Sequence, residues 1–184
     1  MIFVLTLVAV ISSGLLAYFA VYTQPYIEKN KKAEIEKAIK EVVPGTVESK
    51  ALKDENKFKI FAGYDKDGKL LGYAVYTVGT GFQDLITIMF GVDKHLEKMY
   101  RLEVLEQKET PGLGAKITNE NIFLKFWKNK DIREEIILAK PPKSENELKD
   151  NEVNAISGAT ISSRSVVTIV NKALKRVKEE VNNG

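Results

Sequence analysis

Hydrophobic and polar residues divide the chain into an apolar N-terminal segment and a longer part of mixed pattern. Residues 1–22 contain no charged side chain, and every Lys, Arg, Asp and Glu comes after them. A helix of this length can cross a hydrocarbon core of about 30 Å, and it pairs the backbone N–H and C=O groups that lipid leaves without partners. The pattern therefore predicts a single transmembrane anchor at 1–22.

A cleaved signal peptide is the alternative interpretation of this segment. Signal peptides have a basic start and a shorter apolar stretch, whereas here no Lys or Arg precedes a long apolar run. Tyr18, Phe19 and Tyr22 stand near its end, where aromatic side chains gather at membrane interfaces. We therefore favour an uncleaved anchor. The five Lys and three Glu of residues 23–40 leave its orientation open, because large domains can cross a membrane despite nearby positive charge.

Residues 23–44 predict a juxtamembrane linker and an amphipathic helix, which ends before Pro44-Gly45. Apolar side chains recur among Lys and Glu at helical spacing. They are Ile27, Ile35, Ala38, Ile39 and Val42.

Residues 45–184 predict one compact domain. Period-two alternation at 58–64, a turn at 65–68 and a return run at 70–78 indicate a hairpin. The return strand is apolar on both faces, so it belongs in the middle of a sheet. The other predicted elements are strands at 85–92, 100–107 and 136–138, and helices at 120–130 and about 162–181. The predicted fold class is α+β, a mostly antiparallel sheet with flanking helices.

Composition narrows the functions that this domain can have. The net charge is +3 with both signs interspersed, which argues against a nucleic-acid partner. The absence of cysteine excludes disulfides, iron–sulfur ligation and thiolate zinc sites, and the single histidine, His95, cannot build a His-rich metal site. We expect no metal bound by this chain, so a redox role requires an organic cofactor.

Small residues gather in three loops, GTGF (79–82), ETPGLG (109–114) and SGATISS (157–163). Glycine lets a backbone approach a ligand closely, although each loop taken alone could be an ordinary turn. The third loop is the most specific, because it stands at the start of the last predicted helix. Ser162 or Ser163 is a natural N-cap for that helix.

A helix N-terminus with unpaired N–H groups also favours a phosphate. Gly158 and Ala159 leave space there, and Thr160 would stand at the helix start with its hydroxyl outward. Walker A, G-x-G-x-x-G and G-x-S-x-G patterns are absent. Without a histidine partner, Thr160 or Ser157 is a poor hydrolytic nucleophile. We therefore expect no catalytic residue. A phosphate at this place could be bound reversibly or be esterified to Thr160, and in the second case Thr160 would be an attachment point.

The stretches GTGFQDLI (79–86), QKETPGLGAK (107–116) and ISGATISS (156–163), in this order, resemble the FMN-binding domain family. Its members include the flavin-carrying subunits of the Rnf ion-translocating ferredoxin:NAD oxidoreductase complexes and of sodium-pumping NADH:quinone oxidoreductases. The resemblance covers essentially the whole chain. It implies an electron-transfer subunit without independent catalytic activity, and the short domain favours the Rnf type. In the family, FMN is joined through its phosphate to the threonine that corresponds to Thr160.

The resemblance also implies a pocket and a set of partners. The ETPGLG loop would lie against the isoalloxazine, and the other two loops would complete the site. The implied cofactor-binding residues are Thr160, Ser157, Gly158, Ala159, Ser162, Ser163, Glu109, Thr110, Gly112, Leu113, Gly114, Gly79 and Gly81. Asn154 stands where the family commonly has an aspartate.

The implied partners are other membrane and iron–sulfur subunits, a flavin transferase for maturation, and membrane lipid. One helix cannot form an ion pathway, so pumping would need multi-span partners. The domain would lie on the extracytoplasmic side of the cell membrane. Two other interpretations remain open: a membrane-tethered sensor that binds a flavin or another phosphate ligand without a covalent bond, and an assembly subunit whose last loop only caps a helix.

Overall fold

A computed structural model describes residues 1–182, which form two compact units, Met1–Lys37 and a second one that begins at Ala38. Helix α1 spans Ile2–Val42. Its residues up to Lys37 make up the first unit, and its last turn belongs to the second. The predicted anchor and amphipathic helix are thus parts of one helix, with Pro25 inside it. By length and composition α1 can cross a membrane, and the protein covers none of its apolar stretch. A signal sequence would share these two properties.

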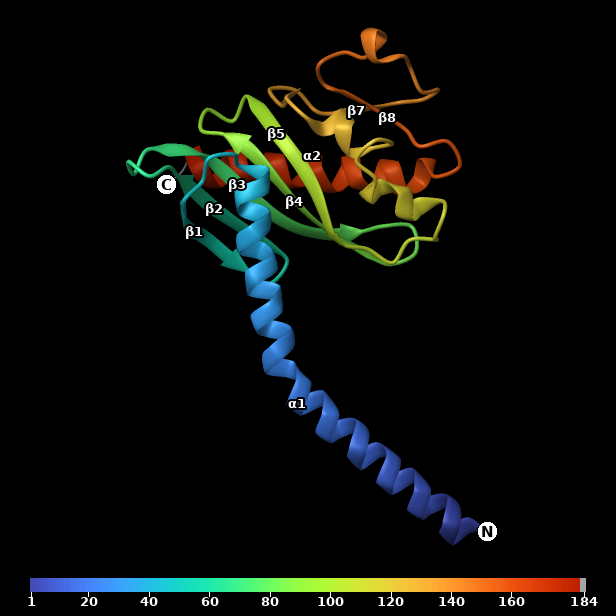
Figure 1. The fold of residues 1–184 in the computed structure, drawn as a ribbon. Coiled ribbons are helices and arrows are strands. Elements are labelled where there is room, and N and C mark those ends of the chain that lie inside the picture. Colours follow the sequence, from blue (N-terminus) through green and yellow to red (C-terminus); the bar gives the residue numbers. More distant parts are fainter. Residues whose placement is uncertain (183–184) are drawn as a thin grey trace. The chain divides into compact units, whose positions relative to one another are not determined.

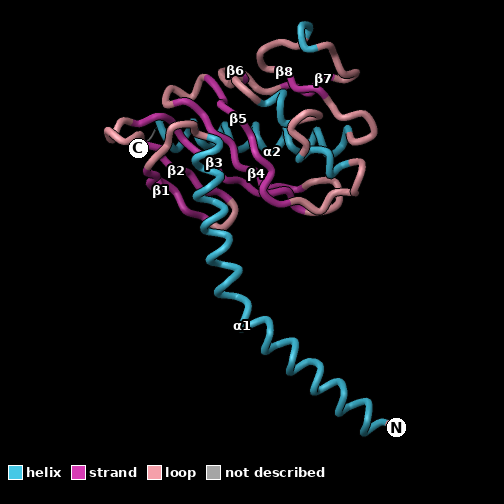
Figure 2. The backbone as a smooth tube through the Cα atoms, viewed as in Figure 1, coloured by secondary structure: helices cyan, strands magenta, loops and turns pink. Residues whose placement is uncertain are grey.

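The second unit is built on a six-stranded antiparallel sheet, which confirms the predicted fold class (Figures 1 and 2). The strands follow one another in the sheet in the order of the chain. They are β1 (Glu48–Glu55), β2 (Phe58–Tyr64), β3 (Leu70–Thr80), β4 (Leu85–Asp93), β5 (Lys98–Glu106) and β6 (Lys130–Asp131). A separate parallel pair is formed by β7 (Ile137–Ala139) and β8 (Glu152–Asn154). The helical elements are α2 (Thr160–Asn182) and the short 3₁₀ helices η1 (Gly114–Thr118), η2 (Leu124–Trp127) and η3 (Glu145–Glu147).

Helix α2 covers one face of the sheet and packs along β3 (Figure 1). Its predicted apolar stripe is buried from Val166 to Val177 and joins the core with the inward residues of β3 and β4, such as Val75 and Phe90. A Cβ atom on Gly79 would come within 2.4 Å of the Ile169 side chain. The glycine therefore lets the first half of α2 approach the end of β3 closely.

The last turn of α1, residues 38–42, covers the opposite face of the sheet. Ala38, Ile39 and Val42 are buried there. A Cβ atom on Gly91 of β4 would lie 1.9 Å from the Val42 carbonyl oxygen, so only glycine permits this approach. Because both faces are covered, the central strands carry apolar side chains on both sides, as the sequence of β3 predicts.

Two elements differ from the prediction. Strand β1 was not predicted, since seven of its eight residues are exposed. Backbone pairing with β2 holds it instead. Two ion pairs also connect it to α2: Lys53 pairs with Glu180 at 2.7 Å, and Glu55 with Arg176 at 2.7 Å.

The predicted helix at 120–130 was wrong, because the structure forms turns and the short helix η2 there. The Asn119 carboxamide accepts the N–H groups of Asn121 and Ile122, and Asn129 adopts a positive φ of 55°. Between these turns, burial of Phe123 and Trp127 against the sheet replaces helical periodicity.

Asn154, at the end of β8, fixes the loop that precedes this strand. Its carboxamide oxygen accepts the Lys143 N–H at 2.8 Å, and its NH₂ group donates to the Lys143 carbonyl at 2.7 Å. A carboxylate accepts but cannot donate, so aspartate could satisfy only one half of this arrangement. The structure therefore explains why asparagine, and not aspartate, suits position 154: its side chain both accepts from and donates to the backbone of Lys143.

We expect Asn154→Asp to lower the free energy of unfolding by about 1–3 kcal/mol at neutral pH, because a buried carbonyl loses its donor and faces a carboxylate. Urea unfolding followed by the fluorescence of Trp127 measures this. The loss should shrink in acid, where a protonated aspartate regains a donor. The exposed Asn121→Asp is the control, and an equal loss in both variants would contradict the role given to Asn154.

Candidate functional site

The carboxylate of Glu109 links the three small-residue loops. Its Oε1 atom accepts the backbone N–H groups of Phe82 at 2.7 Å and Gln83 at 3.1 Å. Its Oε2 atom accepts the hydroxyl of Ser162 at 2.6 Å. Glu109 itself is only 4% exposed. One buried side chain of the second loop thus holds the first loop and the start of α2 in place.

Two glycines make room for this carboxylate. A Cβ atom on Gly81 would lie 2.4 Å from Glu109 Oε1, and one on Gly114 would lie 2.7 Å from Oε2 and 2.6 Å from Ser162 Oγ. Any larger residue at either place would displace a hydrogen-bonded atom. Gly81 and Gly114 therefore contribute to the site by leaving space for the Glu109 carboxylate and its hydrogen bonds.

Further contacts close the first loop and attach it to the second. Asp84 accepts the Gly81 N–H with its carbonyl at 2.8 Å and the Leu85 N–H with its carboxylate at 2.7 Å. The bond from Leu85, followed by the pairing with Lys108, lowers the pKa of Asp84. The Gln83 carboxamide donates to the Thr110 hydroxyl at 2.9 Å. The loops therefore form a connected rim.

Helix α2 begins at Thr160, two residues earlier than predicted. The prediction that Ser162 or Ser163 is the N-cap was wrong, because both lie inside the first turn. The Ser163 hydroxyl accepts the Ile156 N–H at 3.0 Å and donates to the Ala159 carbonyl at 3.0 Å. Ser163 thereby folds the preceding loop back onto the helix, while Ser162 turns to Glu109.

The first turn of α2 offers free donors next to Thr160. Ser163 is the first residue whose N–H donates into the helix, to the Ala159 carbonyl at 3.0 Å. The preceding amides of Thr160, Ile161 and Ser162 are the N–H groups that a helix leaves without intrahelical partners. Within residues 1–182, the half-buried hydroxyl of Thr160 forms no hydrogen bond either.

A pocket of about 330 Å³ opens at this point, between the three loops. Its lining contains seven of the residues predicted from the sequence, together with Thr160 itself. The lining residues are Phe82, Glu109, Thr110, Leu113, Gly114, Gly158, Ala159, Thr160, Ile161 and Ser162. The side chains of Phe82, Leu113 and Ile161 are apolar and exposed.

The other predicted site residues lie outside this lining. Ser157 is exposed beside the pocket, and Ser163 is fully buried behind it. Gly112 and Gly81 shape their loops, Gly112 with a positive φ of 76°. Gly79 belongs to a second groove. The sequence reasoning missed Phe82 and Ile161, although each directly adjoins a residue that it singled out.

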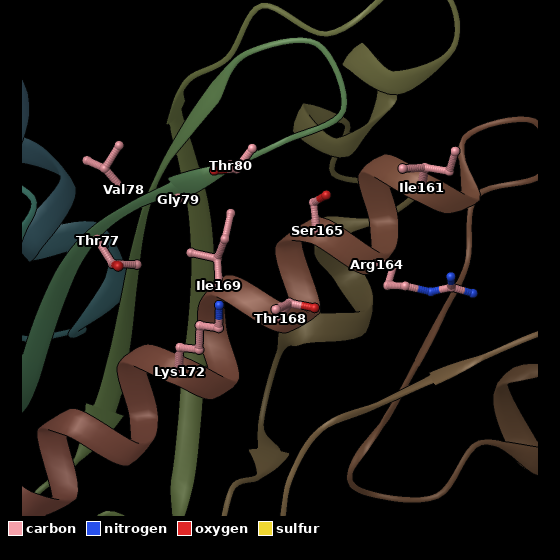
Figure 3. Close-up of a pocket in the computed structure, with 10 residues that line it drawn as sticks. All are labelled: Thr77, Val78, Gly79, Thr80, Ile161, Arg164, Ser165, Thr168, Ile169 and Lys172. Atoms are coloured by element: carbon pink, nitrogen blue, oxygen red, sulfur yellow. The ribbon is translucent and has the colours of Figure 1, made fainter.

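The second groove, of about 370 Å³, runs between α2 and the end of β3 (Figure 3). It meets the pocket at Ile161, which lines both. Two cationic side chains, Arg164 and Lys172, line it together with several hydroxyl groups. Among residues 1–182, no group of three or more His, Cys, Asp or Glu side chains is placed to hold a metal ion.

Comparison with known proteins gives concordant matches. The family model described as FMN-binding domain matches residues 81–175. The G subunit of the ion-translocating oxidoreductase complex of Methanosarcina acetivorans is 28% identical over 96% of this chain and 92% of its own length. The G subunit of the Na(+)-translocating ferredoxin:NAD(+) oxidoreductase complex of Acetobacterium woodii is 28% identical over 67% of this chain and 56% of its own length.

Solved structures share the fold. NqrC of Shewanella oneidensis superposes with a TM-score of 0.58 at 23% identity, covering 73% of this chain and 72% of that one. The C subunit of the Na(+)-translocating NADH-quinone reductase of Parabacteroides distasonis gives a TM-score of 0.50 at 26% identity, covering 67% and 62%. The family match spans just over half of the chain and includes the second and third loops that form the pocket. The chain belongs to the FMN-binding domain family.

Proposed function

We propose that this protein is the membrane-anchored flavoprotein subunit of an Rnf-type ferredoxin:NAD oxidoreductase complex, and that FMN is attached through its phosphate to the Thr160 hydroxyl. One observation carries the proposal: Thr160 combines an unbonded hydroxyl, adjacent free helix amides and a position in the pocket formed by the three loops. The two relatives named as G subunits of ion-translocating complexes support the Rnf assignment.

The residues present fit a flavin phosphate. The amides of Thr160, Ile161 and Ser162 precede the first intrahelical bond of α2 and can donate to phosphate oxygens, with the helix dipole favouring negative charge. Gly158 has a positive φ of 81° and leaves the approach to Thr160 clear. The exposed apolar side chains of Phe82 and Leu113 offer contact surface to a flat aromatic ring.

When bound, FMN supplies reversible uptake and release of electrons in its ring. The chain's own residues hold and orient it. Glu109 fixes the loops around the pocket, the α2 amides would bind the phosphate, and the exposed apolar side chains of Phe82 and Leu113 would exclude water from the ring surface they contact. Because the ester would be covalent, the flavin would stay with the protein in both oxidation states.

The apolar part of α1 supports a single-pass anchor. The proposal puts the domain on the extracytoplasmic side of the cell membrane, as the family resemblance implies. An anchor would keep the flavin near the cofactors of membrane and iron–sulfur partner subunits. Maturation would require a flavin transferase, since Glu109, the ionisable side chain of the pocket, already accepts three donors and is not free to activate the Thr160 hydroxyl. The alternative is the corresponding subunit of a sodium-pumping NADH:quinone oxidoreductase, because the C subunit of the Na(+)-translocating NADH-quinone reductase of Parabacteroides distasonis shares the fold.

Intact mass tests the attachment site. We expect the chain produced with a flavin transferase to gain the mass of one FMN minus water, and Thr160→Ala to gain none, because it lacks the ester oxygen. Ser49→Ala, an exposed change on β1 outside the pocket, is the control and should be loaded fully.

Acid precipitation separates a covalent flavin from a bound one. Colour that stays with the precipitated protein supports the ester, whereas release into the supernatant would support the tethered binding module. An adduct that persists in Thr160→Ala would refute the site.

Glu109→Ala removes the acceptor for three donors in two other loops. We expect a loss of about 3 kcal/mol in the free energy of unfolding, because buried donors remain without partners. Glu109→Gln keeps an acceptor for the amides and a polar partner for Ser162, so its loss should be about 1 kcal/mol.

Hydrogen exchange locates the effect of these substitutions. The amides of Phe82 and Gln83 should exchange faster in Glu109→Ala, and flavin loading should fall with them. Glu106→Ala, an exposed change at the end of β5, should alter none of these quantities. Unchanged exchange at Phe82 and Gln83 would show that Glu109 does not hold the first loop.

A further inference from the structure

The pocket at Thr160 contains no positive side chain. Among its lining residues Glu109 alone carries an acid or a base, and its charge is negative. A phosphodiester at Thr160 would add a second negative charge close by. Backbone amides can bind such a charge, and a nearby cationic side chain would add stronger, charge-assisted hydrogen bonds to them.

Arg164 is placed to supply this cation. It follows Thr160 by four residues on α2, so the two side chains lie on the same helix face, one turn apart. Helical side chains tilt toward the N-terminus, and Figure 3 shows Arg164 extending toward the Ile161 end of the helix, away from Lys172. Its groove meets the Thr160 pocket at Ile161.

Arg164 also differs from the other arginines of the chain, all of which lie in the described residues. Arg101 pairs with Glu103, Arg133 with Asp131, and Arg176 with Glu55. Arg164 forms no ion pair with any residue in 1–182. Its side chain is exposed, so it is available to a ligand, and no protein carboxylate competes for it.

We propose that Arg164 binds the phosphodiester of the flavin attached to Thr160. This inference rests on the proposed function and deepens it. A guanidinium can donate two parallel N–H bonds to two phosphate oxygens, which fixes the orientation of the group as well as its charge. Arg164 is therefore a positioning residue: it sets the direction in which the ester leaves α2, and hence where the flavin lies.

The test compares loaded and unloaded full-length protein in detergent, for the wild type and for Arg164→Ala, Arg164→Lys and Lys172→Ala. Lys172 is the matched control, because it is an exposed cation of the same groove, two turns further along α2. In the unloaded state all four proteins should unfold at the same temperature, because Arg164 has no partner in the protein.

Loading should stabilise the wild type more than Arg164→Ala, and the difference in midpoint should be about 2–4 °C. Arg164→Lys should recover part of it, since an ammonium keeps the charge but loses the two-bond geometry. Lys172→Ala should behave as the wild type. The ³¹P resonance of the attached phosphodiester should move in Arg164→Ala and stay in place in Lys172→Ala, an effect that a purely structural role would not produce.

The outcomes separate the two proposals. If wild type and Arg164→Ala carry the Thr160 adduct with equal stabilisation and the same ³¹P shift, the role of Arg164 is refuted and the attachment site stands. If the wild type gains no adduct in the presence of the transferase, the attachment site is refuted, and the role of Arg164 with it.

Discussion

The buried carboxylate of Glu109 is the contact on which the site depends. It joins loops that are 26 to 53 residues apart along the chain. A carboxylate suits this place because it accepts at two oxygens without needing to donate, and all three partners are donors. Glycine is needed at positions 81 and 114 because a side chain there would collide with the carboxylate oxygens of Glu109. The shape of the pocket is therefore a consequence of satisfying one acidic side chain away from water.

The sheet provides the fixed frame for these loops. The middle parts of strands β3 and β4 are buried between α2 and the last turn of α1, whereas Thr80 and Leu85, at the first loop, are exposed. The first loop joins these two strands, and the third loop leads directly into α2, which packs on β3. The first and third loops of the pocket are therefore attached to β3 and α2, which contact each other in the core. Such a scaffold limits the motion of the loops more than their own few hydrogen bonds would.

The hydrophobic pattern predicted the central strands and α2 because their burial repeats along the chain. Strand β1 gave no such signal, since its side chains are exposed and the strand is formed by backbone pairing with β2, with added ion pairs to α2 more than a hundred residues away. Residues 120–130 carry apolar residues at spacings that imitate a helix, while the side chain of Asn119 and the backbone of Asn129 impose turns. Neither the pairing of β1 with distant residues nor the turn-forming role of the two asparagines appears in the hydrophobic periodicity.

At the site, glycine and hydroxyl residues indicated the loops, and the structure places Thr160 at the start of α2, in the lining of the pocket. The roles of its neighbours could not be predicted in the same way. A serine near a helix start can cap the helix, bond the preceding loop or reach another segment, and Ser163 and Ser162 take the second and third of these courses. Phe82 and Ile161 carried no polar signal, so their part in the lining required the folded geometry. Covalent attachment at Thr160 would also change what this open lining has to do. A tethered ring is present at an effective concentration of the order of millimolar or above, whatever the amount of free flavin. Weak contacts are then enough to keep it in place, and one edge can stay uncovered for electron exchange with a partner.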